Sequence, residues 1–446
     1  MENMDSTVLA TSLPAIATDI GESPLALKLA LTSYLVSLAV FIPISGWVAD
    51  RYGSRTVFAT AIAVFVGGSV LCAVSGTLAA FVLARFLQGM GGAMMVPVGR
   101  LVLMRAVPKS EYITALNYLT IPALLGPVIG PALGGAITLY FDWRWIFIIN
   151  VPIGILGFVL VLRHIPDIRE EDRRPFDVYG FALSGIGLSV LMLGISALGG
   201  HLLSTAVTTT CIVSGAAVLG AYAWHARRTE HPVIDLRLLK VPTFFHGAIV
   251  GSLFRIGLGA TPFLLPLLLQ IGFGLDPLQS GLITCATAVG AMFIKTLTVR
   301  ILRRWGFRSV LTVNGVAASA SLAIYCLFTA ATPHLLIIAV LVFSGCLRSL
   351  QFTSLQAMSF SDATRESMSQ ATSVSSMAQR LSQSLGIALG AYALQLSSTA
   401  QGHADIVAAD FWPAFLAIAL VSMVSAFVHL RLPASAGAEV SGHAKS

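Results

Sequence analysis

Six charged side chains lie at or within long apolar stretches of this sequence: Asp5, Arg85, Arg255, Lys295, Arg348 and Arg380. Such positions are rare here, because only 11% of the 446 residues are charged and 56% are hydrophobic. A charge at the centre of a bilayer costs about 2.5–3.5 kcal/mol on insertion scales. Side chains kept at that cost are candidates for moving protons or for binding ions and polar solutes.

Asp5 and Arg85 have the clearest chemistry of the six. Removal from water favours the protonated form of a carboxyl group, whereas a nearby cation favours its ionised form. A carboxylate held between these two effects can bind and release a proton. We therefore predict that Asp5 and Arg85 are proton-coupling residues. The alternatives are structural, with Asp5 a helix-end carboxylate and Arg85 a hydrogen-bonding residue between domains.

The remaining four charges are cationic. We expect Arg255 and Lys295 to extend toward the membrane surface or to form structural pairs. Arg348 and Arg380 lie nearer the centre of their segments and are candidates to line a cavity. Two glutamines, Gln88 and Gln270, are also candidates to line a cavity. For Gln270 the alternative is a plain position in the core or facing lipid.

A further candidate site is the glycine- and proline-rich stretch 126–135, inside an uncharged segment from about residue 112 to 139. Three of its glycines recur at every fourth residue and therefore share one helix face. Small residues let neighbouring helices approach closely in lipid, and prolines can kink a helix. We predict a bent, closely packed hinge helix, with a simple packing seam as the alternative. Its site residues are Gly126, Pro127, Gly130, Pro131, Gly134 and Gly135.

Membrane-spanning helices must position these residues. A soluble domain would have about 25% charged residues, whereas this chain has 11% and a mean hydropathy of +0.85. We expect the first span to lack its N-terminal half, as a late start codon would cause, because its apolar run is shorter than the roughly 20 residues of a span. We predict an all-α polytopic membrane protein of fourteen spans at residues 1–20, 28–49, 56–76, 79–104, 112–139, 143–163, 177–198, 203–224, 243–271, 277–301, 308–331, 334–357, 370–397 and 410–431.

The basic residues are unevenly distributed over the connections. Most of the 27 Lys and Arg residues follow even-numbered helices or lie at the C-terminus, whereas Lys28 and Arg144 lie on the opposite side. Cytoplasmic loops are enriched in Lys and Arg, so we predict that both termini are cytoplasmic. Membrane topology thus explains the net charge of +7, and we expect no nucleic-acid partner.

The sequence contains an internal repeat. Residues 51–55 recur at 304–308, and two glycines of 126–135 recur as Gly386 and Gly390 at nearly the same separation. Such a period indicates two six-helix halves, an arrangement in which substrate is held between the halves. The predicted parts are a six-helix bundle at 1–164, two extra helices with flanking loops at 165–242, a second six-helix bundle at 243–432 and a cytoplasmic tail at 433–446.

The connection between the second and third helices, at residues 46–55, combines charges with turn residues. Its glycine permits a tight turn, and its aspartate can cap the next helix or pair with an arginine. We predict a cytoplasmic latch that holds one arrangement of the helices, with an ordinary basic loop as the alternative. The latch residues are Gly46, Asp50, Arg51, Gly53 and Arg55.

The sequence has no motif for a cofactor or for covalent catalysis. It contains no nucleotide-binding loop, its five cysteines form no C-x-x-C pair and its nine histidines show no H-E-x-x-H spacing. We therefore expect no enzyme activity, no cofactor and no metal site.

Five ordered motifs make the chain similar to a known family. The latch region resembles the signature loop of the major facilitator superfamily, residues 81–93 its fourth-helix motif and residues 126–135 its antiporter motif. Residues 5–14 and 143–154 resemble stretches of the fourteen-span drug–proton antiporters of the EmrB/QacA type. Residues 92–100 are most similar to the MdtD branch of that family. The resemblance covers nearly the whole chain.

The resemblance implies a major facilitator fold, with two six-helix bundles and two extra linker helices, in the bacterial inner membrane. It implies export of drug-like or amphiphilic small molecules by alternating access in exchange for protons, with residues 126–135 as a seal against leak. The implied partners are a small-molecule substrate, protons and the lipid bilayer; we expect a monomer and leave accessory efflux partners open. The alternatives are a proton-coupled uptake carrier for a specific metabolite and a non-transporting membrane sensor or assembly subunit.

The chain departs from the family pattern at several places, among them the shortened first helix and Arg348, which has no counterpart in that pattern. Ala10 stands where the family usually has asparagine, and Ser54 stands where it usually has a basic residue. In the second copy of the latch, Arg303 takes the place of Asp50. We therefore expect a working latch only in the first half.

Overall fold

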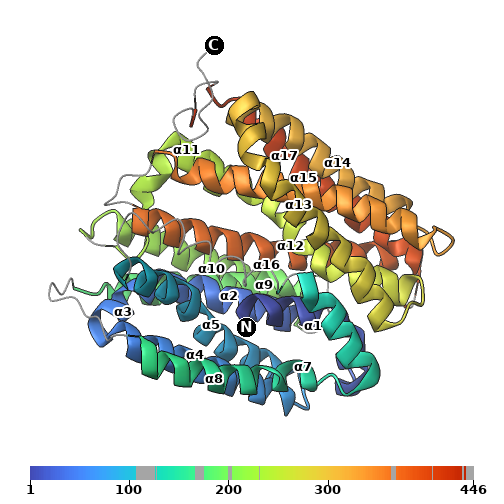
Figure 1. Cartoon of the computed structure of the whole chain (residues 1–446), viewed down its shortest axis with the longest axis horizontal. Helices are drawn as coiled ribbons and strands as arrows, with labels where there is room; N and C mark the ends of the chain where they lie inside the picture. Colours follow the sequence, from blue (N-terminus) through green and yellow to red (C-terminus); the bar gives the residue numbers. More distant parts are fainter. Residues whose placement is uncertain are drawn as a thin grey trace. The chain divides into compact units, whose positions relative to one another are not determined.

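The computed structural model describes residues 1–106, 126, 128–165, 175–198, 203–230, 232–362, 368–403, 405–433 and 436–437. Within these ranges the chain is helical and has no strand (Figure 1). The predicted all-α fold class is therefore confirmed.

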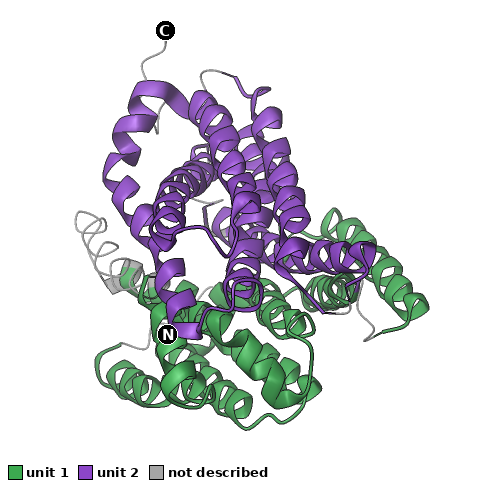
Figure 2. Ribbon diagram, turned by 90° about the vertical axis from the view of Figure 1, so that its right-hand side faces the viewer, with its two compact units in different colours: residues 1–197, 202–234 green, residues 198–201, 235–446 purple. Residues whose placement is uncertain are grey.

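The chain divides into two compact units, which Figure 2 shows in separate colours. The helices α9 (Val178–Ala197) and α10 (Thr205–Ala226) pack against each other and belong to unit 1. The predicted domain boundaries at residues 164, 242 and 432 stay predictions. Unit 1 comprises Met1–Ala197 and Leu202–Ile234, and unit 2 comprises Leu198–His201 and Asp235–Ser446.

Unit 1 begins with α1 (Glu2–Ile20), which ends at Gly21 in a left-handed conformation with φ 75°. Glycine adopts this conformation without the steric penalty that a Cβ would bring, so it is a common helix terminator. Before α9 and α10, the other helices of unit 1 are α2 (Lys28–Phe41), η1 (Ile42–Ile44), α3 (Ser45–Tyr52), α4 (Ser54–Ala73), α5 (Leu78–Ala106), an apolar helix at Val128–Tyr140, α7 (Trp145–Ile148) and α8 (Asn150–His164).

Among its described residues, unit 2 contains three π-helical segments between α-helical stretches: η4 (Phe245–Val250), η5 (Leu268–Gly272) and η6 (Val310–Asn314). Pro262 and Pro266 lie in the second half of α12, just before η5. Because proline has no backbone N–H, each interrupts the α-helical hydrogen bonds, and the helix continues with the π-helical pattern of η5. The elements of unit 2 are η3 (Leu236–Lys240), α11 (Pro242–Phe244), η4 (Phe245–Val250), α12 (Gly251–Leu267), η5 (Leu268–Gly272), α13 (Pro277–Ser309), η6 (Val310–Asn314), α14 (Gly315–Ile324), η7 (Tyr325–Leu327), α15 (His334–Phe360), α16 (Met368–Gln401), η8 (Ala408–Asp410) and α17 (Phe411–His429).

The repeated pentapeptide breaks the helix in both units. Gly53 separates α3 from α4 with φ 92° and ψ 135°, and Gly306 interrupts α13 with φ 70° and ψ 166°. Residues with a Cβ rarely adopt such positive φ values. The same backbone break at the matching glycine supports the internal repeat that the sequence indicates.

The described residues include ten helices that are long and apolar enough to span a membrane. On α8, Ile155, Leu156 and Leu160 are 59%, 60% and 47% exposed. Contiguous apolar faces of this kind are unfavourable in water and are suited to lipid. The chain is therefore a multi-pass membrane protein. Each of the fourteen predicted ranges overlaps a described helix, while the number of spans stays a prediction.

Candidate functional site

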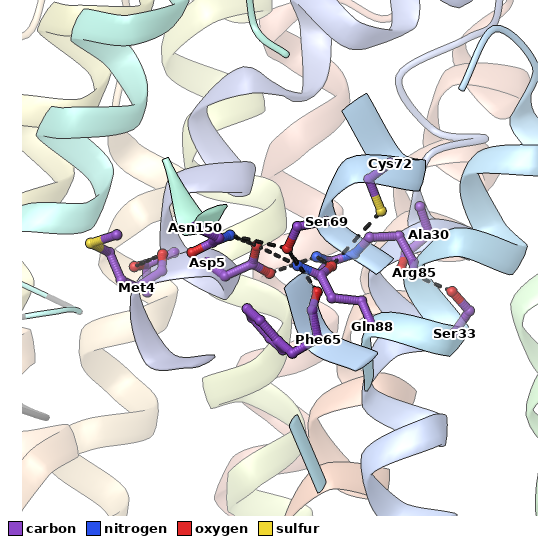
Figure 3. Close-up of polar contacts among 11 residues, drawn as sticks. Met4, Asp5, Ala30, Ser33, Phe65, Ser69, Cys72, Arg85, Gln88 and Asn150 are labelled. Carbon is purple, nitrogen blue, oxygen red and sulfur yellow. Dashed lines mark hydrogen bonds and ion pairs between the residues drawn. The ribbon is translucent and has the colours of Figure 1, made fainter. Parts of the chain in front are cut away.

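Asp5 and Arg85 form a buried ion pair in unit 1 (Figure 3). Asp5 lies near the start of α1, and Arg85 lies in the first third of α5. Nη1 of Arg85 donates to Oδ2 of Asp5 at 2.6 Å, and the two side chains are 0% and 1% exposed. The structure thus brings together the two residues that the sequence singles out for proton coupling. Their role in coupling stays a prediction.

Gln88 joins the ion pair from the same face of α5, because it follows Arg85 by three residues. Its Nε2 donates to Oδ1 of Asp5 at 2.9 Å and to Oγ of Ser69 on α4 at 2.7 Å. Its Oε1 accepts a hydrogen bond from Nη1 of Arg85 at 2.5 Å. Gln88, a candidate for lining a cavity, is thus fully buried within a polar network.

Asn150, the first residue of α8, also belongs to this network and is not among the site residues that the sequence predicts. Its Nδ2 donates to Oδ1 of Asp5 at 3.0 Å and to Oγ of Ser69 at 3.4 Å (Figure 3). Asn150 lies in the stretch 143–154 that resembles the antiporter family. Only this resemblance distinguishes Asn150 in the sequence, because an asparagine at the start of a helix is common in any helical protein.

Two aromatic rings cover the Arg85 guanidinium. Its Cζ lies 4.3 Å from the ring centre of Tyr34 on α2 and 5.8 Å from that of Phe147 on α7. Phe147 in turn makes an edge contact with Phe81, with ring centres 5.7 Å apart. Cation–π contacts contribute about 2 kcal/mol when desolvated. The rings therefore stabilise the cation in addition to its hydrogen bonds to Asp5 and Gln88.

Three polar atoms of the network have no hydrogen-bond partner among the described residues: Nε and Nη2 of Arg85 and Oδ1 of Asn150. Buried polar atoms in native proteins nearly always have partners. Two donor nitrogens and one acceptor oxygen of the network are thus unused in this arrangement of the described side chains.

Glycines let the helices that carry the network approach closely. A Cβ at Gly68 of α4 would lie 2.6 Å from the Cα of Gln88, and one at Gly89 of α5 would lie 2.7 Å from the carbonyl oxygen of Tyr34. A Cβ at Gly91 would lie 2.5 Å from the backbone nitrogen of Phe65. These glycines thus let α5 pack closely against α4 and α2, which places Gln88 within hydrogen-bond distance of Ser69 on α4.

The glycine face of the helix Val128–Tyr140 packs against α1. A Cβ at Gly130 would clash with the side chain of Thr7, and a Cβ at Gly134 would clash with the carbonyl oxygen of Val8. Just before this helix, the carbonyl oxygen of Gly126 accepts a hydrogen bond from Oγ1 of Thr7 at 3.3 Å. The stretch predicted as a hinge therefore holds the helix that carries Asp5.

The remaining predicted residues of this stretch extend the same contact. Oγ1 of Thr11 donates to the carbonyl oxygen of Pro131 at 3.3 Å. Gly135 is buried, and Pro127 lies outside the described residues. Proline bends and small side chains both favour close, adjustable packing. A hinge or sealing role for this helix stays a prediction.

The matching glycines of unit 2 make a corresponding contact. A Cβ at Gly386 of α16 would clash with the carbonyl oxygen of Ile256 and would lie 2.9 Å from the backbone nitrogen of Ala260 on α12. A Cβ at Gly390 would lie 3.3 Å from the Cβ of Ala260. The α16 helix thus packs on α12 as Val128–Tyr140 packs on α1.

The predicted latch residues lie around the helix break between α3 and α4. Asp50 is half-buried near the end of α3, and the guanidinium of Arg51 lies 5.8 Å from the ring centre of Trp47. Arg55 is exposed in the first turn of α4. A Cβ at Gly46 would meet nothing within 4 Å, so packing does not require glycine there. The latch function stays a prediction.

The cavity candidates other than Gln88 lie in unit 2. Arg348 of α15 is 5% exposed, and Arg380 of α16 is half-buried. Nε2 of Gln270 donates to Oγ of Ser280 at 3.4 Å. The structure therefore divides the four candidates between the two units.

One of the two alternatives expected for Arg255 is wrong. Arg255 of α12 is 0% exposed, so it does not extend toward the membrane surface. Its guanidinium turns back along the chain, and Nη1 donates to the carbonyl oxygen of Ala248 at 3.1 Å. The alternative of a structural pairing agrees with this hydrogen bond to a backbone carbonyl, and Arg255 forms no ion pair with the described residues. Lys295 of α13 is exposed.

Comparisons with known proteins identify the family. The model of the Major Facilitator Superfamily matches residues 1–387 and 247–443. The chain is 38% identical to the multidrug resistance protein MdtD of Cronobacter sakazakii over 436 residues, which cover 97% of this chain and 92% of that protein. It is 38% identical to MdtD of Serratia proteamaculans over 440 residues, covering 97% and 91% of the two chains.

Solved structures show the same fold at low sequence identity. A POT family transporter in complex with 5-aminolevulinic acid has a TM-score of 0.68 and 15% identity, covering 96% of this chain and 93% of that one. The nucleoside transporter NupG has a TM-score of 0.58 and 15% identity, covering 96% of each chain. The family and the branch that the sequence motifs indicate are thus confirmed. The chain belongs to the Major Facilitator Superfamily.

Proposed function

We propose that this protein exports drug-like or amphiphilic small molecules by alternating access in exchange for protons. The superfamily fold supports a small-molecule transporter, and the relatives named MdtD are described as multidrug resistance proteins. We further propose that it lies in the bacterial inner membrane with both termini cytoplasmic, works as a monomer and carries out no enzymatic reaction. The distribution of Lys and Arg supports this orientation.

The observation that supports proton coupling most strongly is the buried Asp5–Arg85 pair with its partners Gln88 and Asn150. When Asp5 binds a proton, Arg85 loses its counter-charge in a desolvated site. Removing one partner of a buried ion pair typically costs about 3–5 kcal/mol. The helices carrying these side chains then favour an arrangement in which Arg85 finds other partners. Protonation is thereby linked to conformation.

The contact between Val128–Tyr140 and α1 supports the link from protonation to movement. Because glycines bring the two helices into backbone contact, a displacement of α1 is transmitted directly to its neighbour. We propose that this seam closes the pathway on one side during exchange. The latch at Asp50 and Arg51 would hold one of the two arrangements.

The proton gradient is a sufficient energy source. One charge moving through 100 mV releases about 2.3 kcal/mol. At about 1.4 kcal/mol per tenfold concentration ratio, one proton sustains roughly a 50-fold gradient of a neutral solute. Export therefore needs no nucleotide.

The test is proton-linked flux in liposomes that contain only this protein, measured across a panel of compounds with a pH-sensitive dye inside. We expect solute and protons to move in opposite directions. Asp5→Asn should abolish the linkage while leaving membrane insertion intact, and Asp19→Asn, an exposed carboxylate on the same helix, is the matched control. Movement of solute and protons in the same direction would refute exchange and favour an uptake carrier. Unchanged coupling in Asp5→Asn would remove Asp5 from the mechanism.

A further inference from the structure

The helix α10 of unit 1 presents an exposed apolar side. Val213 and Trp224 are 62% and 60% exposed. They are eleven positions apart in the sequence, which is close to three full helical turns, so they lie on the same side of the helix. Exposed apolar surface on a membrane helix is suited to lipid. We therefore place this side of α10 against the acyl chains of the bilayer.

The end of α10 lies at the depth where the acyl chains meet the lipid headgroups. Trp224 is in the last turn of α10, and Tyr179, which is 77% exposed, is in the first turn of α9. Nε2 of His225 lies 2.8 Å from Oδ1 of Asp177, so the end of α10 and the start of α9 are at the same level. Exposed Trp and Tyr side chains are enriched at the membrane–water interface. The two rings therefore mark the interface on this helix pair.

Two exposed arginines, Arg227 and Arg228, follow directly beyond this level. Cζ of Arg228 lies 4.0 Å from the ring centre of Trp224. The guanidinium is thus held over the ring on the side of α10 that faces lipid. At 1.5 Å per residue, the arginines lie about 5–6 Å beyond the tryptophan along the helix axis, toward the water and the phosphate groups of the lipids.

The charge of Arg228 is not compensated as that of another arginine in unit 1 is. Cζ of Arg144 lies 4.6 Å from the ring centre of Trp143, which is a similar stacked arrangement. However, Arg144 also forms ion pairs with Asp19 at 2.7 Å and with Asp142 at 3.3 Å. Arg228 forms no ion pair with the described residues. Its stacked guanidinium is therefore available to an external anion.

The nearby acidic residues leave this surface with an excess of positive charge. Asp177 is buried, and its carboxylate accepts a hydrogen bond from the backbone N–H of Gly180 at 2.8 Å in addition to its contact with His225. Glu230 is exposed and forms no ion pair with the described residues. The exposed end of α10 thus carries two cations and one carboxylate.

We propose that Arg227, Arg228 and the ring of Trp224 form a binding surface for the headgroup of an anionic phospholipid. The guanidinium groups bind phosphate oxygens, which their paired N–H donors match, and the acyl chains lie along the exposed side of α10. Basic residues beside a membrane helix attract anionic lipids. The inference needs only the position of the chain in a membrane, so it does not depend on the proposed export.

The test is native mass spectrometry of the purified full chain with phosphatidylglycerol and, separately, with zwitterionic phosphatidylcholine of the same acyl chains. We expect the wild type to bind phosphatidylglycerol about fivefold more tightly. Arg227→Gln and Arg228→Gln should each weaken phosphatidylglycerol binding about fivefold, which corresponds to about 1 kcal/mol, and leave phosphatidylcholine binding unchanged. The matched control is Arg144→Gln, which removes an arginine stacked on a tryptophan whose charge is already paired, and it should bind both lipids as the wild type does.

Arg228→Lys distinguishes attraction of the headgroup from a structural role of the arginine. Lysine keeps the charge, so phosphatidylglycerol affinity should stay within about twofold of the wild type. The preference for phosphatidylglycerol should also decrease at high ionic strength, because salt screens exposed charges. Equal affinity of the wild type for the two lipids would overturn the proposal, as would wild-type affinity in both glutamine variants or equal losses for both lipids.

Discussion

The buried pair Asp5–Arg85 and the exposed pair Asp19–Arg144 differ in burial but hardly in length. Their N–O distances are 2.6 and 2.7 Å, whereas their side chains are at most 1% exposed in the first pair and 34% and 42% exposed in the second. Comparing them separates the effect of desolvation from that of contact distance. We expect the two pairs to contribute very differently to stability.

Asp5→Asn and Arg85→Gln should each lower the free energy of unfolding by about 3–5 kcal/mol, because each leaves one charge buried without its partner. The double variant removes both charges and should lose clearly less than the sum, with an interaction energy of about 2–3 kcal/mol. For Asp19→Asn and Arg144→Gln the same cycle should give less than about 1 kcal/mol.

Reversible unfolding of the purified protein in mixed micelles, followed by circular dichroism, measures these differences. The same cycle should be run for both pairs under one set of conditions. If the effects at Asp5 and Arg85 are additive within about 0.5 kcal/mol, burial does not couple the two charges. The proposed link between protonation and conformation would then lose its basis.

Two further predictions concern the residues around this pair. Gly134→Ala should destabilise the protein by about 1–3 kcal/mol, because its Cβ would clash with the Val8 carbonyl oxygen. Gly220→Ala is the control: nothing lies within 4 Å of a Cβ there, so this variant should be neutral or stabilising in the same unfolding assay. Equal effects of the two substitutions would contradict the packing argument. Asn150→Leu removes a hydrogen bond to a carboxylate, which is worth about 1.5–3 kcal/mol. The variant should insert into the membrane normally and lower proton-linked flux in liposomes about tenfold. Flux equal to that of the wild type would place Asn150 outside the mechanism.

The ion pair could be predicted from the sequence because charges in apolar segments are few. With Asp5 as an acid in one such segment and Arg85 as a cation in another, pairing is the least costly solution. The helices could also be located, since charged and turn residues delimit apolar runs. The helix break at Gly306 follows from its similarity to the pentapeptide around Gly53.

The other members of the network could not be predicted. Ser69 and Asn150 are ordinary polar residues, and their place in the network depends on the rotation of α4 and α8 about their axes. The same limit applies to Arg255, since its position in the sequence does not reveal that its helix face is buried. Helix rotation depends on tertiary packing, which a single sequence encodes only weakly.

The most direct test of proton exchange at Asp5 is the number of protons released when a transported compound binds to the purified protein in unbuffered solution. If proton and substrate favour different states, each must displace the other by linkage. We expect the wild type to release about one proton per bound molecule through this linkage, and Asp5→Asn to bind the compound with no release. Equal release by both proteins would contradict the assignment of the exchanged proton to Asp5.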